Sequence, residues 1–199
     1  RRHPLAPQAT NLNSLINGMD DLLRRSLGGD IKIDMKLADD LCFCKIDTAQ
    51  MENAVLNLAI NGRDAMDPGG GLIIATSNLD VDQLLQFGEE VVQPGRYVVL
   101  SVTDTGTGMS GEVMRQAFDP FFTTKEVGQG SGLGLSMVHG FVRQSHGHVS
   151  VYSEVGVGTT VRLYFKAAPN VPATQALVPE INEPNANANE TILIVEEDP

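Results

Sequence analysis

Residues 97–108 read YVVLSVTDTGTG, a run of apolar and β-branched residues that passes directly into a loop with two glycines. Such a run is typical of a buried strand, and the glycines free the backbone where the strand ends. The stretch therefore predicts a strand over 97–103 with Asp104 at the start of the following loop.

The segments around this strand alternate between helix and strand patterns. Apolar residues recur at helical spacing in three segments, whereas residues 31–37 alternate apolar and polar side chains. The predicted helices cover 11–27, 47–66 and 133–144, and the other predicted strands cover 31–37, 72–77, 148–153 and 159–165. We expect an acidic connection over 80–95, while 104–134 show no clear period. This order predicts a two-layer α/β sandwich on a mixed sheet.

The chain is strongly acidic, with 14 Lys and Arg against 25 Asp and Glu in 199 residues, or −11 at pH 7. This charge opposes binding to nucleic acids and to anionic membranes. No apolar run approaches the roughly 20 residues that span a bilayer, so we expect neither partner for this chain. Cys42 and Cys44 are expected to be buried free thiols, which suits a cytoplasmic location.

The two ends of the chain differ from its middle. The sequence begins at Arg1 rather than Met, so we expect it to be part of a longer protein. Residues 168–190 are rich in Pro, Asn and Ala, which predicts a flexible linker. Residues 191–195 (TILIV) then resume strand character.

Polar residues form a stripe along the predicted helix 47–66. Asn53, Asn57, Asn61 and Asp64 follow one another at i, i+4, i+8 and i+11. Asn is a poor helix former, so a stripe of three favours a function over the alternative of a solvated face. Carboxamide oxygens suit a hard cation such as Mg²⁺ that shares phosphate oxygens.

The glycines after Asp104 match a nucleotide motif only superficially. Gly106, Gly108 and Gly111 satisfy G-x-G-x-x-G. A dinucleotide site also needs a helix and an acidic residue at the end of a second strand, and the protein-kinase pattern needs V-A-I-K, H-R-D and D-F-G elements. The surrounding residues provide neither, so we reject both interpretations.

A second glycine-rich loop precedes the predicted helix 133–144. It reads GQGSGLGL over residues 128–135. Glycines free the backbone there, and the helix start offers N–H groups and a positive dipole end, which together predict a phosphate-binding loop. A mobile glycine loop without a ligand is the alternative. Lys125, just upstream, could reach a phosphate as a point charge.

Together these segments resemble the ATP-binding domain of bacterial sensor histidine kinases. Five motifs occur in that family's order over residues 5–166. They are the N box (53–66), the first glycine box (104–109), the F box (118–125), the second glycine box (130–135) and the closing Gly-Thr signature (158–160).

The resemblance implies an α+β fold of the Bergerat type over residues 5–167. Its mixed sheet would be covered on one face by about three helices, with an ATP lid over about 106–134. Residues 1–10 would link this domain to a dimerisation domain that carries the phosphoacceptor histidine.

The resemblance also implies roles for individual residues in binding ATP and Mg²⁺. Asn61, helped by Asn57, would coordinate Mg²⁺, and Asp104 would accept a hydrogen bond from the adenine amino group. Thr159 would support the adenine site, and Lys125 would reach a phosphate. The glycine boxes would let the backbone approach the nucleotide at Gly106, Gly108, Gly130, Gly132, Leu133 and Gly134.

The implied reaction is transfer of the ATP γ-phosphoryl group to a histidine that this chain lacks. The related gyrase- and Hsp90-like ATPases carry a general-base Glu where this chain has Asn57, and Asn cannot act as a base at neutral pH. None of the four histidines (His3, His139, His146 and His148) lies in the family's His-Glu/Asp-x-x-Asn/Thr-Pro segment.

Two further functions and one further partner remain to be tested. The chain could be an ATPase of the wider superfamily, or an ATP-binding sensing module without turnover. Residues 191–199 resemble the first strand and acidic pair of a response-regulator receiver domain. The parent would then be a hybrid kinase, and a receiver domain would be a partner of this chain.

Overall fold

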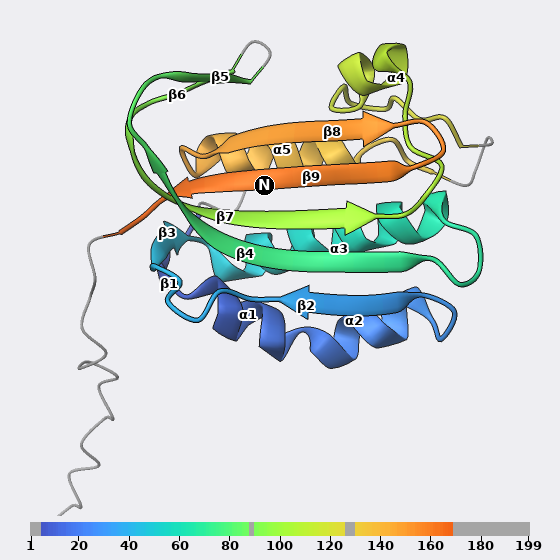
Figure 1. Cartoon of the computed structure of the whole chain (residues 1–199), viewed down its shortest axis with the longest axis horizontal. Helices are drawn as coiled ribbons and strands as arrows, with labels where there is room; N and C mark the ends of the chain where they lie inside the picture. Colours follow the sequence, from blue (N-terminus) through green and yellow to red (C-terminus); the bar gives the residue numbers. More distant parts are fainter. Residues whose placement is uncertain (1–4, 88–89, 126–129, 169–199) are drawn as a thin grey trace, which may run out of the picture.

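The computed structural model describes residues 5–87, 90–125 and 130–168. Its centre is a five-stranded sheet in the order β2-β4-β7-β9-β8 (Figure 1). Strands β2 and β4 are parallel, and the other neighbours are antiparallel. The strands are β2 (Lys32–Lys36), β4 (Gly71–Val81), β7 (Gly95–Asp104), β8 (His148–Glu154) and β9 (Gly158–Lys166).

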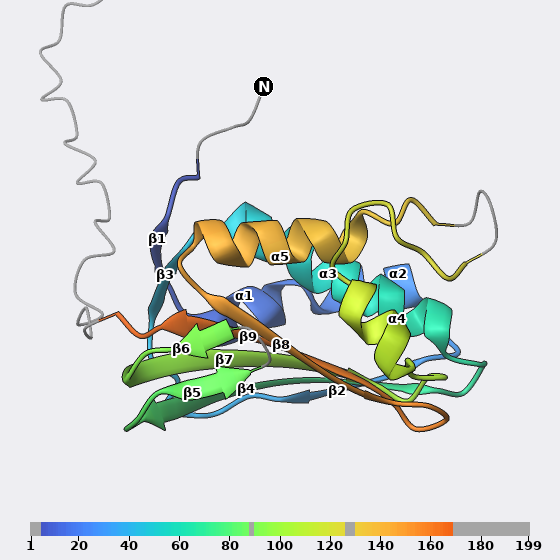
Figure 2. The ribbon, with the colours of Figure 1, turned by 90° about the horizontal axis from the view of Figure 1, so that it is seen from above.

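The helices pack on one face of this sheet, which confirms the predicted two-layer α+β architecture (Figure 2). The helical layer consists of α1 (Leu12–Gly18), α2 (Asp20–Leu27), α3 (Thr48–Ala65) and α5 (Gly134–Gln144). A short helix, α4 (Gly111–Gln116), lies near one end of this layer. The Asp47 side chain caps α3 by accepting a hydrogen bond from the backbone N–H of Gln50 at 3.0 Å.

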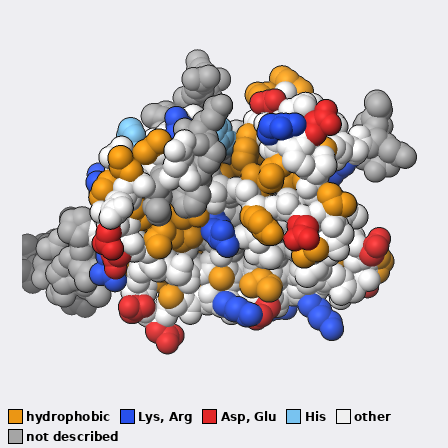
Figure 3. Space-filling model, turned by 45° about the horizontal axis from the view of Figure 1, so that its top comes forward, with side chains coloured by type: hydrophobic (Ala, Val, Ile, Leu, Met, Phe, Trp, Pro, Cys, Tyr) orange, Lys and Arg blue, Asp and Glu red, His pale blue; other side chains and the backbone are white. Residues whose placement is uncertain are grey.

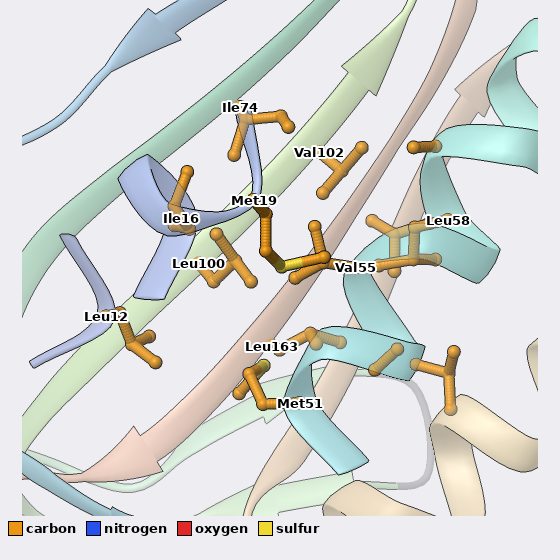
Figure 4. Close-up of a cluster of buried hydrophobic side chains, with 14 of the residues drawn as sticks. Leu12, Ile16, Met19, Met51, Val55, Leu58, Ile74, Leu100, Val102 and Leu163 are labelled. Atoms are coloured by element: carbon orange, nitrogen blue, oxygen red, sulfur yellow. The ribbon is translucent and has the colours of Figure 1, made fainter. Parts of the chain in front are cut away.

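The main core fills the space between the helices and the sheet (Figure 4). Alternation along β7 sends Val98, Leu100 and Val102 toward the helices, where all three are buried. The helices contribute the apolar residues of their inner faces. The residues labelled in Figure 4 from the helical layer are Leu12, Ile16, Met19, Met51, Val55 and Leu58.

A smaller apolar cluster covers part of the opposite face of the sheet. Tyr97 and Val99, which alternate with the core residues of β7, pack there with Tyr164. Val92 of β6 (Glu90–Val92) closes the cluster and is fully buried. Strand β6 pairs with β5 (Leu85–Phe87) as a hairpin. The acidic connection expected over 80–95 therefore contains a short hairpin that was not predicted, and Val92 of this hairpin packs on the sheet.

A second small sheet joins the beginning and the end of the described chain. Strand β1 (Gln8–Thr10) pairs with β3 (Cys44–Ile46). Cys44 also forms a β-bridge with Ala167, and the N–H of Ala168 donates to the carbonyl of Phe43 at 2.7 Å. Both cysteines are free, and Cys44 is buried while Cys42 is half-buried.

One helix prediction needs correction, and one further helix was not predicted. The single helix expected over 11–27 is two helices, because the chain turns at Gly18 and Met19, where Met19 has φ −91° and ψ −6°. Gly is a weak helix former, and the turn lets Met19 enter the core. In addition, α4 forms within 104–134, where Ser110 caps it by accepting from the N–H of Val113 at 3.3 Å.

The surface carries charges of both signs (Figure 3). Acidic and basic side chains are interspersed on the face shown in Figure 3. Among the helices of residues 5–87, 90–125 and 130–168, none combines the length and apolarity required to cross a membrane. The predicted linker over 169–190 and the predicted strand over 191–199 lie outside the described residues, as do residues 1–4.

Truncation of Leu100 should clearly lower the stability of the fold. It is fully buried at the centre of β7, so Leu100→Ala should lower the free energy of unfolding by about 2–5 kcal/mol. Leu22→Ala is the matched control, because Leu22 is 48% exposed. We expect it to change stability by no more than about 0.5 kcal/mol in urea denaturation. Equal losses in the two variants would contradict this assignment of the core.

Candidate functional site

A cavity of about 520 Å³ lies between α3 and the loops that follow β7. Its walls come from α3, the ends of β7 and β9, and described parts of the segment from Thr107 to Leu135. Nine of the eleven predicted site residues line it: Asn57, Asn61, Asp104, Gly108, Lys125, Gly130, Gly132, Gly134 and Thr159. Gly106 and Leu133 do not line it.

Asp104 lies at the end of β7, where its carboxylate joins three segments of the fold. Its Oδ1 atom accepts hydrogen bonds from the N–H of Gly106 at 2.9 Å and the N–H of Thr159 at 3.2 Å. Burial raises the pKa of the Asp104 carboxyl, although these two hydrogen bonds oppose the rise. Both recorded bonds use Oδ1, so Oδ2 is the oxygen available to a ligand.

The first glycine box is held tightly between α3 and the β8–β9 turn. A Cβ atom at Gly106 would lie 2.5 Å from the carbonyl oxygen of Ala65. At Gly108, which has a φ of +66°, a Cβ atom would overlap the carbonyl oxygen of Glu154. Gly106 therefore contributes by close packing behind the cavity rather than by lining it.

The asparagine stripe of α3 faces the beginning of α5. A Cβ atom at Gly134 would lie 3.4 Å from Nδ2 of Asn61 and 3.9 Å from Oδ1 of Asn57. Leu133 is the N-cap residue of α5, and no side chain caps this end. The helix start therefore places backbone N–H groups and a positive dipole end beside two carboxamides. Asn53 belongs to the same stripe but does not line the cavity.

Lys125 brings a positive charge into the cavity from the F box. Its Nζ atom lies 2.5 Å from Oδ2 of Asp64 on α3. Burial of Asp64 opposes its ionisation, but hydrogen bonds and charges from Lys125 and Arg63 outweigh this effect and lower its pKa. The charged side chains that line the cavity in the described residues are thus Asp64, Asp104 and Lys125.

The donor atoms of the cavity fit a cation that is shared with phosphate. Within the described part of the chain, no three His, Cys, Asp or Glu side chains converge as a metal site. Asn57 and Asn61 offer carboxamide oxygens beside the start of α5. A hard cation that retains water and phosphate ligands suits such a sparse set of oxygens.

A known sequence family covers the segment that forms the cavity. Residues 46–169 match the family described as "Histidine kinase-, DNA gyrase B-, and HSP90-like ATPase". The chain belongs to this family. The match begins before α3 and includes every residue that lines the cavity.

Related proteins are bacterial sensor kinases. The chain is 36% identical over its full length to Sensor kinase CckA of Brucella abortus, of which it spans 22%. It is 32% identical over 80% of its length to Sensor histidine kinase ZraS of Escherichia coli K12, of which it spans 31%. The chain therefore spans less than a third of each of these relatives.

Solved structures share the fold of this family domain. The mycobacterial sensor histidine kinase MprB matches 83% of the chain and is itself covered completely, with a TM-score of 0.64 and 23% identity. Full-length ShkA in complex with AMPPNP matches 85% of the chain, with a TM-score of 0.67 and 23% identity, and 33% of that chain is covered.

Two residues at or beside the cavity are not among the predicted site residues. Asp64, a member of the α3 stripe, lines the cavity and contacts Lys125. The Ser153 hydroxyl accepts from the N–H of Met109 at 2.8 Å and lies 2.8 Å from Oγ1 of Thr159. Ser153 lies opposite Thr159 in the β8–β9 pairing. Predicting the register of that hairpin would therefore have placed Ser153 beside the site.

We expect Asp104→Asn to stabilise the ligand-free chain at neutral pH. An acid with a raised pKa contributes stability that is fully present below its unfolded-state pKa, and this contribution is lost as pH rises through the folded-state value. The Asn carboxamide does not ionise, so its contribution to stability is not lost as pH rises. Its oxygen can still accept the hydrogen bonds from the N–H groups of Gly106 and Thr159. In urea denaturation from about pH 4 to pH 7, the stability advantage of the variant should grow with pH.

The matched control for this measurement is Asp39→Asn, because Asp39 is an exposed carboxylate that does not line the cavity. This control should follow the unmodified chain across the same pH range. An advantage of Asp104→Asn that stays constant or shrinks as pH rises would contradict the role assigned to burial.

Proposed function

We propose that this domain binds ATP with Mg²⁺ and supplies the γ-phosphoryl group to a histidine on a dimerisation domain. The observation that carries the proposal is one cavity lined by two chemically different groups. One is the Asp104 carboxylate, and the other is the uncapped start of α5 beside Asn57 and Asn61. The AMPPNP complex of ShkA supports a nucleotide as the ligand of such a cavity.

Asp104 gives the cavity a preference for adenine. Its Oδ1 atom is engaged by Gly106 and Thr159, so Oδ2 would accept a hydrogen bond from the adenine amino group. Guanine has an oxo group at the corresponding position and cannot donate this bond. Because the carboxylate is partly desolvated, leaving it without a donor would be costly, which sharpens the discrimination.

The start of α5 would hold the phosphates. The free N–H groups at the start of α5 and the ammonium group of Lys125 would bind phosphate oxygens. Asn61, helped by Asn57, would hold Mg²⁺ through carboxamide oxygens. When bound, Mg²⁺ neutralises part of the triphosphate charge, which phosphoryl transfer generally requires.

The cavity favours phosphoryl transfer over hydrolysis. Among its described lining residues there is no glutamate that could activate water. Asn57 holds the position of the general base in the ATPase members, and a carboxamide cannot accept the proton. The Asp64 carboxylate pairs with Arg63 and Lys125, and we propose that the Asp104 carboxylate binds adenine, so neither serves as the general base. An ATPase is therefore the weaker alternative, and a sensing module differs from a kinase only in lacking a phosphoacceptor.

The partners follow from this reaction. A dimerisation domain with the family's His-Glu/Asp-x-x-Asn/Thr-Pro segment would receive the phosphoryl group, and an aspartate of a receiver domain would accept it next. His139, His146 and His148 lie in or beside α5 and β8 of the ATP-binding domain itself. We therefore place the phosphoacceptor on another domain of a parent protein that acts in the cytoplasm.

A reconstituted transfer reaction tests this function. We expect the chain with MgATP to form an acid-labile phosphohistidine on an added dimerisation domain, and to release free phosphate only slowly by itself. The control is the same dimerisation domain with its histidine replaced by glutamine. Rapid phosphate release without any phosphohistidine would favour an ATPase, while ATP binding with neither product would favour the sensing module.

Asp104→Asn tests the adenine end separately. Loss of a charge-assisted hydrogen bond should weaken ATP binding by about 1.5–3 kcal/mol, or roughly 10- to 150-fold. Isothermal titration calorimetry with ATP and GTP measures this loss and the change in preference between the two bases. Asp39→Asn again serves as the exposed control. Unchanged ATP affinity in Asp104→Asn would mean that adenine does not bind at Asp104.

A further inference from the structure

Asp64 connects α3 to the F box through Lys125 at the wall of the cavity. The Asp64 carboxylate and the Lys125 ammonium group both line the cavity, and their Oδ2 and Nζ atoms lie 2.5 Å apart. The two side chains are only 25% and 31% exposed. This contact therefore fixes the head of a side chain that would otherwise be one of the most flexible in the protein.

The Asp64 carboxylate is itself held in place from the other side. Arg63 donates to Oδ1 of Asp64 through Nε at 2.9 Å and through Nη2 at 2.6 Å. The Nη1 atom of Arg63 in turn donates to the carbonyl oxygen of Ser26 in α2 at 2.7 Å. A chain of hydrogen bonds therefore runs from α2 through α3 to the F box.

The glycine loop passes close to the stem of the same lysine. A Cβ atom at Gly130 would lie 3.1 Å from Cδ of Lys125, closer than side chains normally pack. The backbone N–H of Lys125 also donates to Oγ1 of Thr123 at 3.2 Å. Lys125 is thus held at its backbone N–H and at its ammonium group, and Gly130 leaves room for its stem.

The charges of this trio favour an anionic ligand. Arg63 and Lys125 carry two positive charges against one on Asp64, so the carboxylate is neutralised and a net charge of about +1 remains. An ammonium group has three N–H donors, and the contact with Asp64 uses one of them. The others remain available for phosphate oxygens while the lysine stays attached to α3.

We infer that Asp64 is a positioning residue, which holds the Lys125 ammonium group at the place where the terminal phosphates of ATP bind. This inference rests on the proposed function. The alternative is that Asp64 competes with ATP for Lys125, and it predicts the opposite change in affinity. If Lys125 had to leave Asp64 before it could bind phosphate, the carboxylate would compete with ATP, and its removal would tighten binding.

The test compares MgATP with AMP, which shares the adenine end but lacks the terminal phosphates. Lys125→Met should weaken MgATP binding roughly tenfold, because it removes a charged contact. Asp64→Asn should weaken it about three- to fivefold, because the contact becomes less well placed in a partly exposed site. Binding of AMP should be unchanged in both variants, which a general structural defect would not produce.

A double variant shows whether Asp64 acts through Lys125. In the Lys125→Met background, Asp64→Asn should cause no further loss of MgATP affinity. Glu52→Gln is the matched control, since it removes an exposed carboxylate from the same helix outside the cavity.

Three results would overturn the inference while leaving ATP binding intact. These are unchanged or tighter MgATP binding in Asp64→Asn, an equal loss for AMP, and losses that multiply in the double variant. If the unmodified chain does not bind MgATP, the proposed function fails, and the inference fails with it.

Discussion

The junction between the central strand and the glycine loop depends on one side-chain oxygen, Oδ1 of Asp104. Strand β7 is paired on both sides, and its last residue, Asp104, lies opposite Leu72 and Thr159 in the two ladders. One oxygen of that carboxylate then binds the N–H groups of both Gly106 and Thr159. The register of the sheet therefore determines where the first glycine box starts, and these two hydrogen bonds partly offset the burial of the charge.

Features that are local in sequence were predictable, whereas contacts between distant segments were not. The apolar run at 97–103 and the glycines before α5 carried strong local patterns, so the central strand and the second glycine box were found. The turn at Met19 was missed because helical spacing continues across it. The contact between Asp64 and Lys125 joins residues 61 positions apart and leaves no periodic signal. The β5–β6 hairpin was missed because only the folded sheet shows the face that Val92 covers.

The cavity combines two features that cost stability in the absence of a ligand. They are a partly desolvated carboxylate and a helix start without a side-chain cap. A bound anion with an adenine group would satisfy both. The same groups therefore oppose the ligand-free fold and favour the occupied one, which is a common relation between stability and function.

Strand β3 has a mechanical consequence for the domain. The chain enters along β1 and leaves at Ala167 and Ala168, and both segments are hydrogen-bonded to the short stretch from Phe43 to Ile46. Both views place β3 at one end of the molecule, with α4 and the start of α5 toward the other (Figures 1 and 2). A force applied through either segment therefore acts on the hydrogen bonds to β3 and Phe43. Pulling these two segments in opposite directions would shear this three-way junction.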